Sequence, residues 1–215
     1  MKVLAATRSG GKQQEIRRVL GGGNLEIVFP DDIGLWETSA EDVLELGESF
    51  EANARRKAEH FARLSSLPTV ADDSGLEVMY LGGAPGVRSK RWAGASGSIA
   101  DVDAANNAEL LRRLAGASDA KRVARYRCVL VFLRSSGAIP TICQGDCSGR
   151  ILTAARGSNG FGYDPLFFSD ELGKTFGEAS AEEKDAVSHR GRALRALMRI
   201  LSVAEQRSVA GEASP

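Results

Sequence analysis

The chain has 215 residues but only three cysteines and two histidines. An odd number of cysteines (Cys128, Cys143 and Cys147) argues against a disulfide framework and for a reducing compartment. Only His60 and His189 could complete a zinc site with them. Each cysteine is therefore better interpreted as a buried, inert thiol.

Long apolar runs and an excess of one charge are also absent. No stretch reaches the roughly 20 apolar residues that a membrane span needs, and the N-terminus MKVLAATRSGG lacks the apolar core of a signal peptide. Lys and Arg together number 28, as do Asp and Glu, so no net charge attracts nucleic acid or an anionic membrane. We expect a cytoplasmic protein that binds neither, in which any anion site is local.

What remains is the composition of a globular protein, with 43% apolar and 26% charged residues. A strand over residues 2–6, a helix over 11–20 and a strand over 25–30 indicate an α/β fold. We expect one domain over 1–202 and a flexible tail over 203–215. The next expected elements are a helix over 49–64 capped by Ser49, strands over 69–71 and 76–81, and a helix that is capped by Asp101 or Asp103 and ends at Leu114. A hairpin of 122–133 with 138–152 follows. Residues 181–202 are expected to be helical from a Ser180–Glu183 capping box, and Ser188 could cap a separate second helix.

A polar loop, Ala6-Thr7-Arg8-Ser9-Gly10-Gly11-Lys12, joins the first strand to the first helix. Backbone N–H groups and the helix dipole make such a junction an anion site, to which the loop adds hydroxyls and a lysine. It is not a P-loop, which would need a glycine in place of Ala6 and Ser or Thr in place of Gln13. From this loop alone, phosphate binding and a solvated surface turn are equally good interpretations.

Two adjacent carboxylates, Asp72 and Asp73, interrupt the apolar stretch VADDSGLEV. Neighbours in a strand point to opposite faces, so the two predict different tasks unless the backbone turns there. One could aim into a cleft at the strand end and share a divalent cation with an anion, while the other could hold a turn by accepting backbone N–H bonds. A plain Asp-Ser-Gly turn is the common alternative.

Three further segments carry polar groups. Residues 41–48 supply four acids, one of which could be a second metal ligand, although spacing does not say which. Within 157–165, two glycines bracket Phe161, whose ring could stack on a base, a contact worth about 1–3 kcal/mol, or point into the core. Residues 184–191 gather Lys, Ser, His and Arg, which suit a carbonyl-bearing base or a phosphate, or form a solvated basic helix start. Together these are the parts of a nucleoside triphosphate site.

Six segments then place the chain beside a known family: LAATRSGGKQQEI, GESFEANARRKA, VADDSGLEVMYLGGAPGVRSKRWAG, NNAELLRRL, GSNGFGYDPLFF and EEKDAVSHRGRAL. In this order they resemble the inosine triphosphate pyrophosphatases, also called dITP/XTP pyrophosphatases, over nearly the whole chain up to about residue 200. The resemblance implies a long mixed β-sheet flanked by helices, with two lobes and the active-site cleft between them. It also implies a homodimer that uses Mg²⁺ to hydrolyse ITP, dITP or XTP to the monophosphate and pyrophosphate.

The resemblance implies roles residue by residue. Asp73 would be the catalytic base and, with Glu45, a Mg²⁺ ligand. Asp72 is then left to brace the turn, with a metal role for it still open. The residues implied to bind substrate are Thr7, Arg8, Ser9, Gly10, Gly11, Lys12, Lys57, Ser74, Phe161, Gly162, Tyr163, Asp164, Lys184, His189 and Arg190. Phe161 would stack on the base, and Lys184, His189 and Arg190 would read the purine edge.

Three positions depart from the family's usual residues. Ser9 stands where Asn is usual, Leu46 where Thr is usual, and Trp92 where Tyr is usual. None removes a charged group, so activity is expected. Two other functions stay open: a non-catalytic nucleotide sensor on the same scaffold, and a pyrophosphatase for modified pyrimidine nucleotides. Pyrophosphate release across a panel of nucleotides separates all three.

Overall fold

The computed structural model describes residues 1–21 and 25–211, with side chains described up to residue 202. The connections contain short 3-10 turns, among them Asp31–Ile33, Ser39–Glu41, Met79–Leu81 and Gly86–Arg91. The main elements are β1 (Lys2–Ala5), α1 (Gly10–Leu20), β2 (Glu26–Val28), α2 (Phe50–Ser65), β3 (Thr69–Val78), α3 (Ile99–Arg113), β4 (Val123–Leu133), β5 (Thr141–Ile151), β6 (Phe167–Ser169), β7 (Lys174–Thr175), α4 (Ala181–Val187) and α5 (His189–Gly211).

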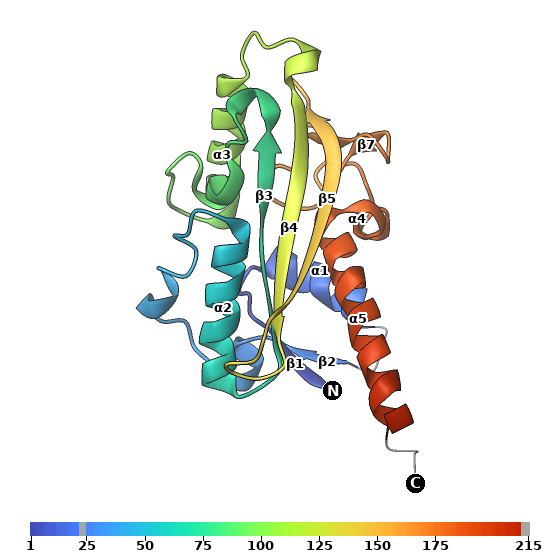
Figure 1. The fold of residues 1–215 in the computed structure, drawn as a ribbon. Helices are drawn as coiled ribbons and strands as arrows, with labels where there is room; N and C mark the ends of the chain where they lie inside the picture. Colours follow the sequence, from blue (N-terminus) through green and yellow to red (C-terminus); the bar gives the residue numbers. More distant parts are fainter. Residues whose placement is uncertain (22–24, 212–215) are drawn as a thin grey trace.

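All seven strands belong to one mixed sheet in the order β2-β1-β3-β4-β5-β6-β7. β1 pairs in parallel with β2 and with the start of β3, whereas β3 to β7 pair antiparallel. The long strands β3, β4 and β5 run almost the height of the molecule (Figure 1). The expected α/β fold with a long mixed sheet is confirmed.

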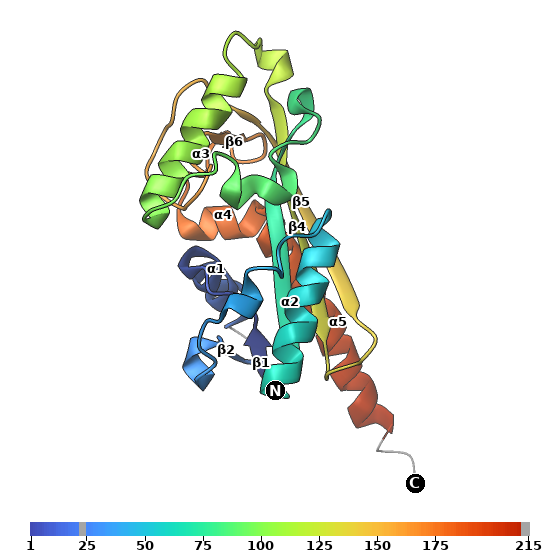
Figure 2. The same ribbon diagram turned by 90° about the vertical axis from the view of Figure 1, so that its left-hand side faces the viewer.

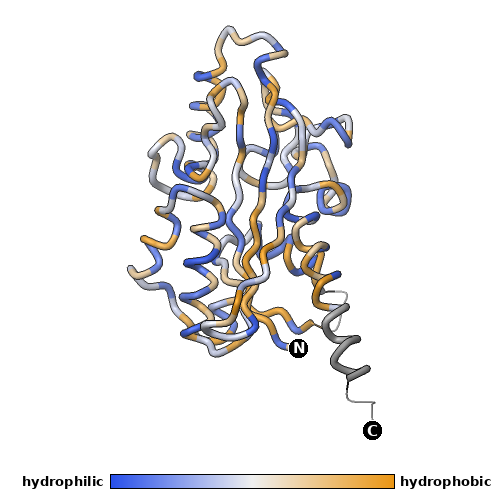
Figure 3. Tube along the Cα trace, in the orientation of Figure 1, coloured by the Kyte–Doolittle hydropathy of each residue, from blue (hydrophilic) through white to orange (hydrophobic). Residues whose placement is uncertain are grey.

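Helices cover both faces of this sheet. α2 lies on one face of β3 and β4, and α5 lies on the other face against β4 and β5 (Figure 1). α2 faces the sheet with an apolar row that includes Phe50, Ala54, Ala58 and Phe61, which recur every three or four residues. The hydropathy trace shows the strands most apolar where these helices flank them (Figure 3). Burial of this row explains why the segment is helical.

Two lobes meet along the long strands (Figure 2). One holds β1, β2, α1 and α2, with a core that includes Val3, Ile16 and Phe29. The other holds α3, β6 and β7, with a separate core that includes Leu110 and Phe167. The predicted two-lobed arrangement is confirmed, and α1 and α4 lie where the lobes face each other.

The prediction of two short strands around an Asp-Ser-Gly turn is wrong. Thr69–Val78 is one continuous strand, paired with β4 from end to end, with Asp72 opposite Leu130 and Asp73 opposite Val129. The ladder with β4 satisfies the backbone groups that a turn would otherwise have to satisfy. Asp72 therefore has no turn to brace, and its task must lie elsewhere.

The hairpin of β4 and β5 is confirmed, but the predicted cap of α3 is wrong. Neither Asp101 nor Asp103 begins this helix. Ser98 is the N-cap and accepts a hydrogen bond from the backbone N–H of Asp101, whose carboxylate accepts one back from Ser98. Asp101 is thus the third residue of a capping box, a position that carries the same composition signal as the cap itself.

The C-terminal helical stretch divides at Ser188, as one of the two alternatives expected. The Ser180–Glu183 capping box begins α4, and the Ser188 hydroxyl accepts from the backbone N–H of Gly191 at the start of α5. α5 continues to Gly211, and residues 212–215 lie outside the described part. The flexible tail stays a prediction. Within the described residues, no helix is long and apolar enough to cross a membrane.

Candidate active site

Asp72 and Asp73 point to opposite faces of β3, as strand alternation predicts. Asp72 contacts Lys12 on α1 and Arg190 on α5. Asp73 contacts Asn53 and Lys57, both on α2. The two carboxylates therefore stand in different electrostatic surroundings and have different tasks.

Asp72 is the anionic centre of a buried cluster. Its Oδ2 lies 3.0 Å from the Lys12 Nζ, accepts from Arg190 at 3.1 Å and accepts from the Ser74 hydroxyl at 3.2 Å. Burial would raise the pKa of Asp72, but the charges of Lys12 and Arg190 outweigh it and hold that pKa well below its usual range. Asp72 is thus a permanent carboxylate that places two cations and a hydroxyl.

Asp73 is buried with much less compensation. Its Oδ2 accepts from the Asn53 amide at 2.8 Å, and its Oδ1 lies 3.9 Å from the Lys57 Nζ, beyond hydrogen-bond distance. Burial, helped by the charge of Glu45, raises the pKa of Asp73 even though Lys57 and Lys12 oppose the rise. A carboxylate with one oxygen fixed, the other available and a raised pKa is suited to accept a proton.

Lys57 lies between the two acids implied to hold a metal. Its Nζ donates to Glu45 at 2.7 Å and approaches Asp73 from the same end. Burial would raise the pKa of Glu45, but Lys57 and Lys12 lower it to about 2. The same acids keep Lys57 charged, because they raise its pKa although burial lowers it. Glu45 and Asp73 thus converge on one point of positive charge.

The donor set fits Mg²⁺ only together with a phosphate. Within the described residues, no group of three His, Cys, Asp or Glu side chains is placed to hold a metal ion. Mg²⁺ takes one or two carboxylates and completes its octahedron with water and phosphate oxygens. Glu45 with the unbonded Oδ1 of Asp73 supplies that number of protein oxygens.

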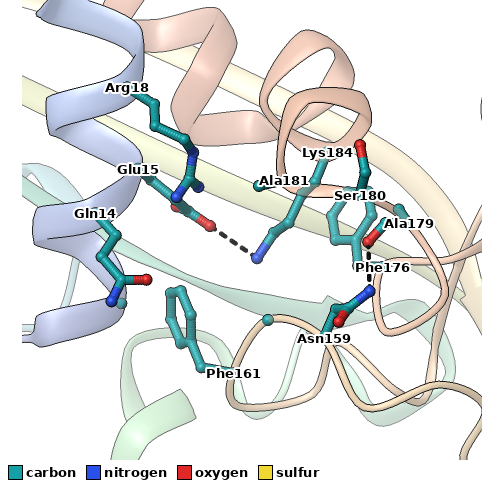
Figure 4. A pocket seen from close by; sticks show the side chains of 12 residues that line it. Gln14, Glu15, Arg18, Asn159, Phe161, Phe176, Ala179, Ser180, Ala181 and Lys184 are labelled. Carbon is teal, nitrogen blue, oxygen red and sulfur yellow. Dashed lines mark hydrogen bonds and ion pairs between the residues drawn. The ribbon is translucent and has the colours of Figure 1, made fainter.

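A cavity of ≈ 530 Å³ opens beside this site, between α1 and the loop and helix of the other lobe (Figure 4). The Phe161 ring forms part of its wall and lies against Gly11, where a Cβ would collide with it. The size and the aromatic wall fit a purine. The lining residues are Gly11, Gln14, Glu15, Arg18, Asn159, Gly160, Phe161, Phe176, Ala179, Ser180, Ala181 and Lys184.

A buried charge network forms the inner wall of the cavity. Lys184 donates to Asp164 and lies 2.8 Å from Glu15, and its Nζ lies 4.6 Å from the centre of the Phe161 ring (Figure 4). Glu15 also pairs with Arg190. Burial would raise the pKa of Glu15, but Arg190 and Lys184 lower it to about 2. Glu15 therefore joins the two cations that the sequence implied as base readers.

His189 is held by its ring face rather than by its nitrogens. It stacks on Tyr126 with ring centres 4.6 Å apart and planes 7° apart. Its Nδ1 is buried without a hydrogen-bond partner among the described residues. Burial, followed by the charge of Arg190, puts the pKa of His189 well below its usual range. The neutral imidazole has one donor and one acceptor nitrogen, and its contact with substrate stays a prediction.

Comparison with known proteins identifies the family of the chain. The model of the Ham1 family matches residues 3–200. The chain belongs to the Ham1 family. Two relatives named dITP/XTP pyrophosphatase illustrate the match: the Syntrophobacter fumaroxidans protein is 49% identical over 92% of this chain and 80% of its own, and the Anaeromyxobacter sp. (strain Fw109-5) protein is 42% identical over 94% and 96%.

Solved Ham1 family structures share the fold. The HAM1 protein of Coxiella burnetii is 34% identical with a TM-score of 0.81, covering 94% of this chain and 98% of its own. A nucleoside-triphosphatase / dITP/XTP pyrophosphatase from Mycobacterium abscessus is 41% identical with a TM-score of 0.70, covering 92% and 98%. The resemblance drawn from the six sequence segments is confirmed.

Three of the implied substrate-binding side chains of this Ham1 family chain are turned to other partners. The Arg8 guanidinium donates to Glu41 instead of facing the loop. The Tyr163 hydroxyl donates to the Ser89 carbonyl, and Asp164 already accepts from Lys184 and the Phe161 backbone N–H. Of the three, only Asp164 contacts lining residues of the cavity, Phe161 and Lys184. Contact of Arg8, Tyr163 and Asp164 with substrate stays a prediction.

The other implied residues lie around the two acids or the cavity. The backbone of Gly162 is fixed from α3, which donates to it from Asn107 and accepts from it at Asp103. Thr7 accepts from the backbone N–H of Ser9, which shapes the phosphate loop. Lys12 and Lys57 lie beside Asp72 and Asp73, Ser74 joins Asp72 to Arg190, and Gly11, Phe161 and Lys184 line the cavity. Arg190 reaches the cavity wall through Glu15, whereas His189 stacks on Tyr126. Ser9 and Gly10 stand at the start of α1.

Two residues of the site escaped the sequence analysis. Glu15 lies three positions after Lys12 on α1, and Asn53 lies four positions before Lys57 on α2, so each shares a helix face with a predicted site residue. The Asn53 side chain is fully buried and joins the backbone N–H of Gly47 to Asp73. Helix periodicity combined with an unexpected buried polar residue is the signal that could have found both.

Gly11→Ala is expected to raise KM for the nucleotide substrate by roughly 10-fold or more. The new Cβ collides with the Phe161 ring, so the ring must leave its place in the cavity wall, and a lost base stack is worth about 1–3 kcal/mol. Gly10→Ala is the matched comparison because a Cβ there meets nothing within 4 Å. Steady-state kinetics of both variants check this, and equal KM values would contradict it.

Proposed function

We propose that the protein hydrolyses non-standard purine nucleoside triphosphates (ITP, dITP and XTP) to the monophosphate and pyrophosphate. The observation that carries the proposal is that α1 joins two sites. Gly11 lines the purine-sized cavity, and Lys12, the next residue, lies 3.0 Å from Asp72 on β3, next to Asp73. A nucleotide with its base in the cavity would therefore place its phosphates along the α1 N-terminus towards Asp73. The relatives' name supports this substrate class.

In the proposed reaction, water attacks the α-phosphorus and the α–β phosphoanhydride breaks, so pyrophosphate leaves. Asp73 orients the water through its unbonded Oδ1 and accepts the proton. Lys12, Lys57 and the loop N–H groups stabilise the negative charge of the transferring and leaving groups. Glu45 and Asp73 would hold Mg²⁺, which when bound screens the triphosphate and acidifies a water molecule.

Base selection follows from hydrogen-bond polarity. Lys184 and Arg190 are obligate donors, so they match the 6-oxo oxygen of hypoxanthine or xanthine. Glu15 holds both cations in place from the side of α1. A 6-amino group would bring its own donors, instead of an acceptor, up to these donors, which a buried site penalises strongly. The arrangement therefore favours ITP, dITP and XTP over ATP.

A nucleotide panel tests this function. Pyrophosphate release is measured with Mg²⁺ and ITP, dITP, XTP, GTP, ATP and modified pyrimidine triphosphates. We expect kcat/KM for the three non-standard purines to exceed that for ATP by roughly 10⁴-fold, and activity to vanish with a chelator. Binding without release would favour a sensor, and preference for a modified pyrimidine would favour the other pyrophosphatase function. Either result would overturn the proposal.

We propose also that the protein acts as a cytoplasmic homodimer. The odd cysteine count supports a reducing compartment, and all three cysteines are free and buried. Exposed apolar side chains such as Met79, Tyr80 and Val123 supply surface that a second copy could cover. Sedimentation equilibrium measures the assembly directly, and a single species at the chain mass of 22.8 kDa would contradict the dimer.

A further inference from the structure

Arg8 belongs to the phosphate loop by sequence, but its side chain leaves the loop. The guanidinium grips the Glu41 carboxylate with two bonds, from Nε at 2.8 Å and from Nη2 at 2.7 Å. It also pairs with Asp31 and donates to the Leu35 carbonyl at 2.9 Å. The Arg8 and Glu41 side chains are only 17% and 14% exposed. The fork that would bind a phosphate is already occupied by two carboxylates and a carbonyl.

The segment that Arg8 grips carries the acid Glu45. Residues 31–48 form the blue-to-cyan stretch beside α2 in Figure 1, and neither 3-10 turn in it contains a buried residue. Ile33, Leu35 and Leu44 are only partly buried against the core, whereas Trp36 is 73% exposed. A segment with so few buried apolar contacts opens locally at low free energy unless other contacts hold it.

The contacts that hold this segment are polar and come from the two sides of the site. At its far end, around Glu45, Asn53 accepts from Gly47, Lys57 donates to Glu45, and Arg91 donates to the Glu45 carbonyl at 2.8 Å. At the other end of the segment, Arg8 of the phosphate loop donates to Asp31, Leu35 and Glu41. Without the Arg8 contacts, Glu45 would be held only by the residues around it.

We propose that Arg8 is a positioning residue, which fixes the Glu41-to-Glu45 segment against the phosphate loop and so sets the place of Glu45. It is not a phosphate ligand. The assignment of Glu45 to the metal rests on the proposed function, whereas the restraint that Arg8 imposes on the segment does not. Because the Arg8 backbone lies in the loop and its side chain in the segment, the residue links the phosphate site to the acidic site.

Hydrogen exchange of the protein without nucleotide or metal tests the restraint. The variants are Arg8→Ala, the isosteric Glu41→Gln and their combination. Backbone N–H groups of Leu35, Glu41 and Leu44, which donate to the carbonyls of Pro30, Thr38 and Glu41, are expected to exchange about 10-fold faster in either single variant. The double variant is expected to match Arg8→Ala, because the Arg8–Glu41 contact that Glu41→Gln weakens is already absent once Arg8 is removed.

Arg17→Ala is the matched control. Arg17 also pairs with an acid of this segment, Asp32, but at 3.4 Å and with both side chains about half exposed, so exchange is expected to stay as in wild type. Arg8→Lys keeps a positive charge but loses the two-bond grip, and it is expected to speed exchange as well.

Kinetics with ITP at saturating Mg²⁺ supply the second readout. If Arg8 positions the segment, Arg8→Ala and Glu41→Gln change kcat/KM alike and without additivity. Unchanged exchange in Arg8→Ala and Glu41→Gln would overturn the proposal. So would a KM increase in Arg8→Ala that Glu41→Gln does not reproduce, since that result identifies a phosphate ligand. A protein that does not hydrolyse ITP would refute the proposed function, but the exchange result would still decide the restraint.

Discussion

Replacing Asp73 with Asn is expected to lower kcat for ITP by about 10³-fold, within the range that positioned proton transfer contributes. The amide cannot accept the proton, but it keeps the volume and can still accept from Asn53 through its carbonyl oxygen. The pKa of Asp73 is raised, which means that the fold disfavours the charged form. Neutral Asn is therefore expected to leave the melting temperature unchanged or slightly higher.

Pyrophosphate release and thermal unfolding of the same preparation check both halves of this prediction. Asp170→Asn is the matched control, because Asp170 is exposed and pairs with Arg150 far along the chain from β3. Near-normal turnover by Asp73→Asn would show that another group activates the water.

Asp72→Ala is expected to cost about 3–5 kcal/mol of unfolding free energy, because it leaves the Lys12 and Arg190 charges unpaired in a buried place. For a chain of this size that corresponds to a melting temperature lower by about 10 °C. The depressed pKa of Asp72 means that its contribution is present above the ordinary aspartate pKa and is lost as the pH falls through the folded-state value. The destabilisation should therefore shrink in acid.

Thermal melts of Asp72→Ala and Asp73→Asn at neutral and acidic pH distinguish the two neighbours. We expect Asp72→Ala to lose stability, and we expect Asp73→Asn to keep its stability but lose turnover. A melting temperature of Asp72→Ala equal to that of wild type would show that the cluster around Arg190 needs no central anion.

Strand alternation, a purely local rule, correctly predicted that the two aspartates point to opposite faces and meet different partners. The prediction of a turn at Asp-Ser-Gly was wrong because it took no account of the strand that pairs with this segment. β4 lies about 50 residues further along the chain and pairs with every residue of β3. Such long-range pairing has no local signature in the sequence. It fixes the extended backbone conformation of this segment and leaves Asp72 no turn to brace.

Site residues that stand in distinctive motifs could be predicted from the sequence, whereas the buried residues that contact them could not. Lys12, Lys57 and Lys184 each stand in a segment whose composition is distinctive, whereas Glu15 and Asn53 occur in ordinary helical sequence. What defines the latter two is burial against partners from other elements. Arg8 shows the converse, since its place in the loop suggested a phosphate contact that its side chain does not point to.

The central claim is that water attacks the α-phosphorus of a non-standard purine nucleotide at Asp73. Hydrolysis of ITP in ¹⁸O-labelled water, with the products separated by mass, tests it most directly. The account predicts that the label enters inosine monophosphate and that pyrophosphate leaves unlabelled, with no label incorporated by Asp73→Asn over the same time. Label in pyrophosphate, or the release of inosine diphosphate with labelled phosphate, would contradict it.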